Sequence, residues 1–235
     1  MTSTTVTSTP PTDFRMVGLD LYRDIHKGIR AELFALVSSS ASLDPADGAG
    51  RCALAAHVRD TYEVLEMHAE HEDVTIQPHL ESELLHLAEQ VAADHVDFEA
   101  RFAGIADLAT AAAEAAVADQ RRLVHLLHLD LAAFTGSYLA HQDLEERQIM
   151  PALEAAIGFE AVLGIHQQII ESIPPDVMAR SLAFMLPAMN VDDRTELLGG
   201  MQAGAPAEVF DGVWSLAGSV LERADLAALG ARLGR

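Results

Sequence analysis

The chain has 235 residues, half of them hydrophobic, so it is long enough to bury a sizeable core and is not disordered as a whole. Its 36 acidic residues against 15 basic ones give a net charge of −21. Such a surface repels phosphate backbones and anionic lipids, which argues against nucleic-acid and membrane partners. The sequence shows neither a signal-peptide pattern nor 18 consecutive apolar residues, and its single cysteine, Cys52, excludes an internal disulfide. We therefore expect a cytoplasmic protein.

Alanine and leucine dominate the composition and aromatic residues make up only 5%, which indicates an all-α protein. Residues 1–12, rich in Ser and Thr, are expected to form a disordered tail. Apolar spacing then predicts four long helices with loops between them. The helices are expected at about residues 14–38, 51–77, 80–102 and 120–149, with loops at 38–50 and, flanked by some helix, at 104–119. This order predicts an up-down-up-down four-helix bundle over residues 13–153.

Residues 154–235 differ from the bundle region in having more frequent helix breakers. Glycine and proline recur here at intervals of one short helix, for example at Gly158, Pro174-Pro175 and Gly199-Gly200. We expect four or five shorter helices that either pack against the bundle or form a small appendage. No motif in this C-terminal extension carries recognisable chemistry.

Two stretches, 68–80 and 141–153, repeat one pattern 73 residues apart. Counting from the first histidine, each has glutamate at +4, isoleucine at +8, proline at +10 and leucine at +12. Each is predicted to be the last turns of a helix that ends at its proline, Pro78 or Pro151. Residues i and i+4 lie on one face of a helix, roughly 6 Å apart. His68 with Glu72, and His141 with Glu145, are therefore two candidate metal-binding pairs.

The other two bundle helices each place one histidine on an apolar face, His26 and His95. Alone, either would be interpreted as a core residue with satisfied hydrogen bonds. Together the four helices spell H–HxxxE–H–HxxxE, which indicates a centre for two metal ions held between facing helices. His71, three residues after His68, is a rival ligand, but it has no carboxylate four residues later.

These residues resemble the haemerythrin-like (HHE cation-binding) domain, in its bacterial H–HxxxE–H–HxxxE form, over about residues 14–153. The resemblance implies a four-helix bundle that holds two iron ions. It further implies that Glu72 and Glu145 bridge the irons together with an oxo or hydroxo group, and that the histidines are terminal ligands. Composition and spacing by themselves do not select iron over zinc or manganese.

The chain departs from the oxygen carriers of that family at two positions. Where they have a second histidine four residues after the third-helix ligand, this chain has Glu99, which is either a further ligand or a partner that orients an imidazole. Where they place an aspartate five residues after the fourth-helix histidine, this chain has Glu146. Position +5 lies about 140° round a helix and +4 only about 40°, so Glu145 is the preferred ligand.

Two six-coordinate irons need about twelve donor positions, and the predicted ligands fill most of them. One or two positions stay open for dioxygen, hydrogen peroxide or nitric oxide. Tyr22, one turn before His26, is a candidate proton donor, or packs with its hydroxyl at the rim of the site. The leading hypothesis is a di-iron enzyme with catalase- or peroxidase-like activity. The alternatives are an oxygen, redox or iron sensor without turnover, and a structural or storage site for zinc or another metal.

Overall fold

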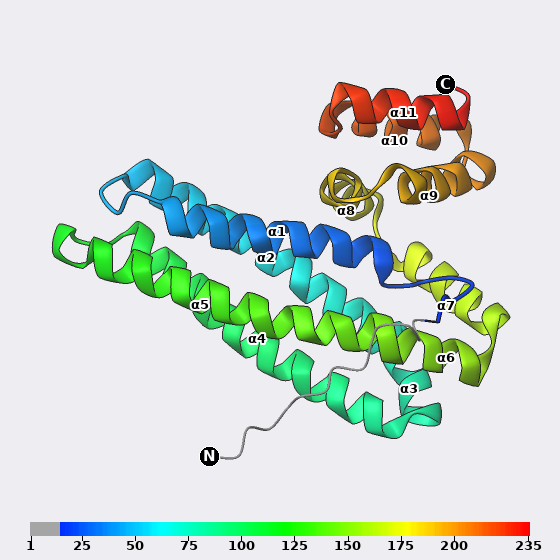
Figure 1. The fold of residues 1–235 in the computed structure, drawn as a ribbon, viewed down its shortest axis with the longest axis horizontal. Coiled ribbons are helices and arrows are strands. Elements are labelled where there is room, and N and C mark those ends of the chain that lie inside the picture. Colours follow the sequence, from blue (N-terminus) through cyan, green and yellow to red (C-terminus); the bar gives the residue numbers. More distant parts are fainter. Residues whose placement is uncertain (1–14) are drawn as a thin grey trace, which may run out of the picture.

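The computed structural model describes residues 15–235, and within that range the chain forms helices and no strand (Figure 1). Four long helices make the bundle: α1 (Arg23–Ser42), α2 (Gly48–Thr75), α4 (Leu85–Ala113) and α5 (Val117–Leu144). Neighbouring helices pack as α1 on α2, α2 on α4, α4 on α5 and α5 on α1. The predicted all-α four-helix bundle is confirmed. The predicted disordered tail, residues 1–12, lies outside the described range.

Two apolar clusters fill the bundle, one on each side of the candidate metal-binding residues. The first contains residues such as Ile29, Leu65 and Phe98, and the second contains Tyr22, Ile76 and Val91. On each of the four helices the candidate histidine falls between a residue of one cluster and a residue of the other: His26, His68, His95 and His141. The folding of four amphipathic helices thus encloses the polar residues between two dry layers.

The helix boundaries that differ from the predicted ones include the start of α1 and the segment 104–119. Helix α1 begins at Arg23 rather than near residue 14, because the Asp20 carboxylate accepts hydrogen bonds from the backbone N–H groups of Tyr22 and Arg23, both 3.0 Å long. The segment 104–119, expected to be a loop, is almost entirely helical, and only residues 114–116 separate α4 from α5. Alanine has the highest helix propensity, and Ala109 and Ala112 bury their faces in the core.

The two prolines of the repeat act differently. The long helix α2 ends at Thr75, shortly before Pro78, and the short helix α3 (Gln77–Glu83) has the proline in its first turn. At Pro151 the predicted stop is wrong: α5 runs into a π-helical turn, η1 (Glu145–Ile149), and then into α6 (Met150–Ile157). The N–H of Met150 bonds to the carbonyl of Glu145, and Pro151 falls in the first turn of α6, where its missing N–H is tolerated.

The continuous rod Val117–Ile157 is long and apolar enough, by length and composition alone, to cross a membrane. The core helix of a soluble bundle passes the same test. In this structure one face of the rod carries Phe134, His141 and Glu145, all of them buried against other helices.

Five helices follow: α7 (Phe159–Ser172), α8 (Pro175–Ala188), α9 (Val191–Gly204), α10 (Ala207–Val220) and α11 (Arg223–Leu233). The turn into α7 is made by Gly158, whose φ of 82° is a conformation that L side chains rarely adopt. Helix α7 adds Val162 and Ile165 to a bundle cluster, whereas α8–α11 share a core of their own. The domain boundary expected at residue 153 stays a prediction, but apolar packing continues with the bundle through α7.

Among the C-terminal helices, α8 packs on α1, and the others stack beyond it beside the bundle (Figure 1). A Cβ added to Gly28 would lie 2.5 Å from the Phe184 ring, so α1 and α8 approach closely only because residue 28 is glycine. Next to it, Lys27 forms an ion pair with the largely buried Asp193 of α9, and Arg23 lies 3.5 Å from the same carboxylate. The extension is therefore docked on the residues that flank His26.

Candidate metal centre

Six of the seven predicted ligands come together in the middle of the bundle. Two groups of ligand atoms form, and within each group all of the atoms lie within 4.8 Å of one another. One group contains Glu72, His95, His141 and Glu145, and the other contains His26, His68 and Glu72. Glu72 belongs to both groups, so the arrangement is that of two adjacent sites that share a ligand.

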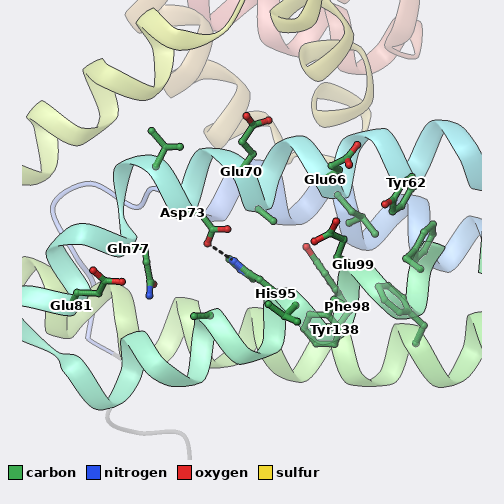
Figure 2. A pocket seen from close by; sticks show the side chains of 17 residues that line it. Tyr62, Glu66, Glu70, Asp73, Gln77, Glu81, His95, Phe98, Glu99 and Tyr138 are labelled. Atoms are coloured by element: carbon green, nitrogen blue, oxygen red, sulfur yellow. Dashed lines mark hydrogen bonds and ion pairs between the residues drawn. The ribbon is translucent and has the colours of Figure 1, made fainter. Parts of the chain in front are cut away.

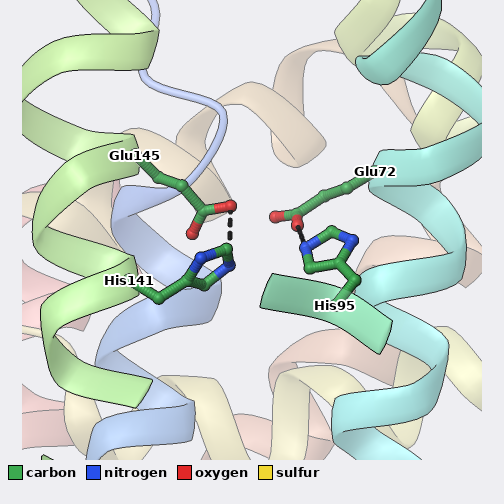
Figure 3. Close-up of side chains that lie close together, drawn as sticks. All are labelled: Glu72, His95, His141 and Glu145. Atoms are coloured by element: carbon green, nitrogen blue, oxygen red, sulfur yellow. Dashed lines mark ion pairs between the residues drawn. The ribbon is translucent and has the colours of Figure 1, made fainter. Parts of the chain in front are cut away.

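Each of the two glutamates lies between two histidines from different helices. Glu72 has one oxygen 3.0 Å from Nε2 of His68 and the other 3.2 Å from Nε2 of His95. Glu145 has one oxygen 3.1 Å from Nε2 of His141 and the other 3.4 Å from Nε2 of His26. Figure 3 shows the two carboxylates facing each other from α2 and from the end of α5. A carboxylate placed in this way offers one oxygen to each of two ions.

Three carboxylates lie behind the histidines: Asp73 and Asp94 were not identified from the sequence, and Glu146 was considered there only as a less favoured ligand. Asp73 lies 2.8 Å from Nδ1 of His95, Asp94 lies 3.1 Å from Nδ1 of His141, and Glu146 lies 3.0 Å from Nδ1 of His26. A carboxylate only accepts, so each Nδ1 donates and each Nε2 keeps its lone pair for a metal. Each of these acids is adjacent in sequence to a candidate ligand: Asp73 to Glu72, Asp94 to His95, and Glu146 to Glu145. This adjacency is the sequence feature from which they could have been predicted.

The π-turn contributes to the third of these contacts. Glu145 and Glu146, both in η1, point toward α1. Glu145 lies within the centre, and Glu146 lies at its outer side. There Arg30 donates two hydrogen bonds, of 2.7 and 3.0 Å, to the Glu146 carboxylate. Burial works against ionisation of Glu146, but the hydrogen bonds from His26 and Arg30 lower its pKa to about 2. Glu146 is therefore a fixed negative charge that orients His26.

The inner carboxylates have no hydrogen-bond donors of their own. All four carboxylate oxygens of Glu72 and Glu145 are buried and accept no hydrogen bond from the described residues. For His26, His95 and His141, the outer carboxylates hold the imidazole proton on Nδ1, so the Nε2 atoms of these three rings do not donate to Glu72 or Glu145. Buried carboxylates without donors are strongly destabilising unless a cation binds them.

The pKa shifts have the same origin. Burial, and after it the neighbouring charge of Glu145, raises the pKa of Glu72 well above its usual range. Burial, and then the adjacent imidazoles with His26 first, lowers the pKa of His68 well below its usual range. Like groups are packed together away from water, and divalent cations among them would offset both effects.

The spacing also fits metal ions. Nε2 of His26 lies 3.2 Å from Nε2 of His68. Two nitrogen ligands at about 2.1 Å from one ion, at right angles to each other, lie about 3 Å apart. Four imidazoles and two carboxylates make a donor set of nitrogen and hard oxygen, which suits iron, manganese or zinc better than the soft ions that select sulfur.

Glu99 is the predicted ligand that the structure leaves outside. It is exposed and is absent from both groups of ligand atoms. Helix α4 runs antiparallel to α2 and α5, so the +4 position after its histidine lies on the opposite side along the bundle axis from Glu72 and Glu145. Glu99 instead lines a groove between α2 and α4 (Figure 2). His71, the rival ligand, is likewise in neither group and lines a different cavity.

Two tyrosines lie beside the centre. The Tyr22 ring is fully buried rather than at a rim, 5.2 Å from the His26 ring. Tyr138, which the sequence analysis did not single out, is buried one turn before His141, with its ring 5.8 Å away. Burial, followed by the charges of Glu72 and Glu145, raises the pKa of both phenols well above the usual value. Both tyrosines are therefore neutral hydroxyl donors.

Comparison with known proteins gives one match. The sequence model of the family described as "Hemerythrin HHE cation binding domain" matches residues 17–171, a range that contains all six clustered ligands. Searches of curated proteins and of solved structures found no match. The family match covers most of the chain and ends in α7, the last helix that contributes buried residues to a bundle cluster. The chain belongs to the hemerythrin HHE cation-binding domain family.

Proposed function

We propose that this protein is a non-haem di-iron protein that reacts with small oxidants, with a catalase- or peroxidase-like activity on hydrogen peroxide. Dioxygen and nitric oxide are the other ligands of the same chemical class. The observation that carries the proposal is the pair of buried carboxylates, each set between two histidines and without a hydrogen-bond donor. Such a pair binds two ions side by side.

Counting donors supports an open centre. Four imidazole nitrogens and four carboxylate oxygens fill eight of the about twelve positions that two six-coordinate ions offer. Since Glu99 lies outside the cluster, no further protein ligand among the described residues fills the remainder. Iron bound here supplies the electrons that reduction of a small oxidant requires, whereas zinc would not.

The chain's own residues hold protons for such a reaction. The phenol oxygens of Tyr22 and Tyr138 stay protonated at neutral pH, each beside a different histidine of the centre. The apolar layers on both sides keep bulk water from the carboxylates. The two tyrosines are therefore the groups best placed to donate a hydrogen bond or a proton to an oxidant in the centre.

The test has three steps on the full chain. Metal analysis is expected to give about two irons per chain, and the visible spectrum is expected to change on addition of peroxide. An oxygen electrode then measures conversion of two peroxide molecules into two waters and one dioxygen. Tyr138→Phe is expected to keep its iron and slow the reaction about tenfold, with Tyr62→Phe as the control on α2. Iron-loaded protein that reacts with neither peroxide nor nitric oxide would refute the proposal.

A second candidate is an oxygen, redox or iron sensor, because the extension docks next to a ligand. Lys27 and Arg23, on either side of His26, contact Asp193 of α9. A sensor predicts that the protease sensitivity of residues 175–235 changes when iron is added, or when bound iron is oxidised. Equal cleavage in all states removes this candidate. Metal analysis that finds zinc in place of iron would instead support a structural or storage site.

A further inference from the structure

A groove between α2 and α4 reaches inward from the surface as far as the candidate ligand His95 (Figure 2). Its volume is about 610 Å³, and His95, a candidate ligand, lies in its wall. Five carboxylates line it, and no lysine or arginine does: Glu66, Glu70, Asp73, Glu81 and Glu99. The charged side chains that line the groove are thus all carboxylates, and the groove reaches one candidate ligand of the metal centre.

Most of these carboxylates have no partner. Within residues 15–235, Glu66, Glu70, Glu81 and Glu99 form neither an ion pair nor a side-chain hydrogen bond, whereas Asp73 binds Nδ1 of His95. Figure 2 shows Glu66 and Glu99 projecting from the two helices that flank the groove. A partnered acid is usually part of the fold's own ion pairing. Four unpartnered ones along a single groove leave their charge available to a passing cation.

An independent polar group lies inside the groove. Gln77 is 9% exposed; its Nε2 donates to the carbonyl of Ala88, but its Oε1 is buried and has no hydrogen-bond partner among the described residues. A buried amide oxygen left in this way is uncommon and is a suitable ligand for a hard cation. Outer carboxylates, the side chain of Gln77 and the candidate ligand His95 therefore line the same groove.

The floor of the groove strengthens its field. Leu65, Phe98 and Phe102 are buried apolar residues that line it. A cleft with charges of one sign and low-dielectric walls focuses field lines and raises the local concentration of counter-ions. The whole chain is also strongly acidic, but negative charge distributed over the surface does not direct a cation to one place. Carboxylates concentrated in one groove do.

We infer that the groove between α2 and α4 is the route by which divalent metal ions, Fe²⁺ above all, reach the buried centre. The carboxylates at its outer part attract and partly dehydrate the ion, and Gln77 and His95 receive it inside. The inference rests on the proposed function only in requiring that the centre binds iron. It adds that Glu66, Glu70 and Glu81 act on the rate of loading, not on the final occupancy.

The test measures uptake of Fe²⁺ by the metal-free full chain under argon. Loading is stopped at set times with excess chelator, and the retained iron is measured. The triple variant Glu66→Gln/Glu70→Gln/Glu81→Gln is expected to load about tenfold more slowly than wild type at low ionic strength, and to reach the same plateau. The difference is expected to shrink at high salt.

A matched control separates local charge from net charge. Glu89→Gln/Glu114→Gln/Glu208→Gln removes three exposed, unpartnered carboxylates that do not line the groove, and it is expected to load at close to the wild-type rate. A second variant, Ala92→Trp, fills the groove without removing charge and is expected to slow loading at every salt concentration. Glu99→Gln is expected to lower only the rate of iron loading. If Glu99 were a ligand, its replacement would instead lower the final amount of bound iron.

The inference is overturned if the groove variant loads as fast as wild type, if it is slowed no more than the control, or if only its plateau falls. Wild-type protein that reaches a plateau of two irons but does not react with oxidants would refute the proposed function and leave the route standing. Wild-type protein that retains no iron would refute both.

Discussion

Replacing Glu146 tests whether the outer carboxylates hold the centre in shape. Its Oε1 accepts from Nδ1 of His26 at 3.0 Å, and Arg30 locks it with two further hydrogen bonds. Loss of such an outer partner typically lowers metal affinity 10- to 100-fold, or about 1.4–2.7 kcal/mol for one ion. We expect Glu146→Leu to show the full effect. Glu146→Gln should show less, because its amide oxygen still accepts from the imidazole.

Anaerobic titration of metal-free protein with Fe²⁺, in competition with a coloured chelator, measures the two binding constants. The weakened constant should belong to the ion held by His26 and His68. Asp94→Asn, behind His141, should weaken the other ion. Asp143→Asn, two residues from both His141 and Glu145, breaks only an exposed ion pair with Arg147 and should change neither constant. The reasoning is refuted if Glu146→Leu leaves both constants within about twofold of wild type, or if Asp143→Asn matches it.

Three further predictions follow from packing, titration and ligation. Gly28→Ala should lower the unfolding free energy by about 1–3 kcal/mol, because the added Cβ would press on Phe184. Gly104→Ala has open space around the added Cβ and should raise the unfolding free energy by about 0.5–1 kcal/mol. Urea unfolding of both variants measures these changes. Burial lowers the pKa of His166, so as pH falls the unfolded state binds this proton at a higher pH than the folded state does. The free energy of unfolding should therefore decrease below about pH 6.5. In His166→Gln, the melting temperature should decrease less between about pH 7.5 and pH 5.5 than it does in wild type. Fe²⁺ at a thousandfold excess over its dissociation constant should stabilise the chain by about 4 kcal/mol, raising the melting temperature by roughly 10 °C, and Glu72→Ala should abolish most of that rise.

Sequence patterns were sufficient to predict the fold and the six candidate ligands that cluster in the structure, because each prediction rests on local spacing. An i, i+4 pair such as His68 and Glu72 meets on any helix, and apolar periodicity marks the buried face wherever the helix lies. The sequence does not show that Glu99 falls outside the cluster, because the same spacing has the opposite axial direction on an antiparallel helix. That direction matters only once the four helices are assembled around a common point.

The remaining differences arise from contacts that a local pattern does not contain. The segment 104–119 reads as a loop from its composition, yet Ala109 and Ala112 are buried by residues distant in sequence. The partnership of Glu146 with His26 spans 120 residues, and the groove needs two helices side by side. Tyr138 carried a usable signal, since it stands one turn before His141 as Tyr22 does before His26.

The repeat that contains the two metal-binding pairs raises a problem of helical phase. On an uninterrupted α-helix the isoleucine at +8 and the leucine at +12 would lie about 80° and 120° round from the histidine, turning away from the face that the ligands use. All four residues are nevertheless buried: Ile76, Leu80, Ile149 and Leu153. The first copy resets the phase by ending α2 and starting α3 at the proline, and the second resets it with the π-turn, which accommodates one extra residue without breaking the rod. One sequence pattern is thus brought into register by two different backbone solutions. Deleting one residue from 147–149 should therefore rotate the apolar face of α6 out of the core, while leaving His141 where it is.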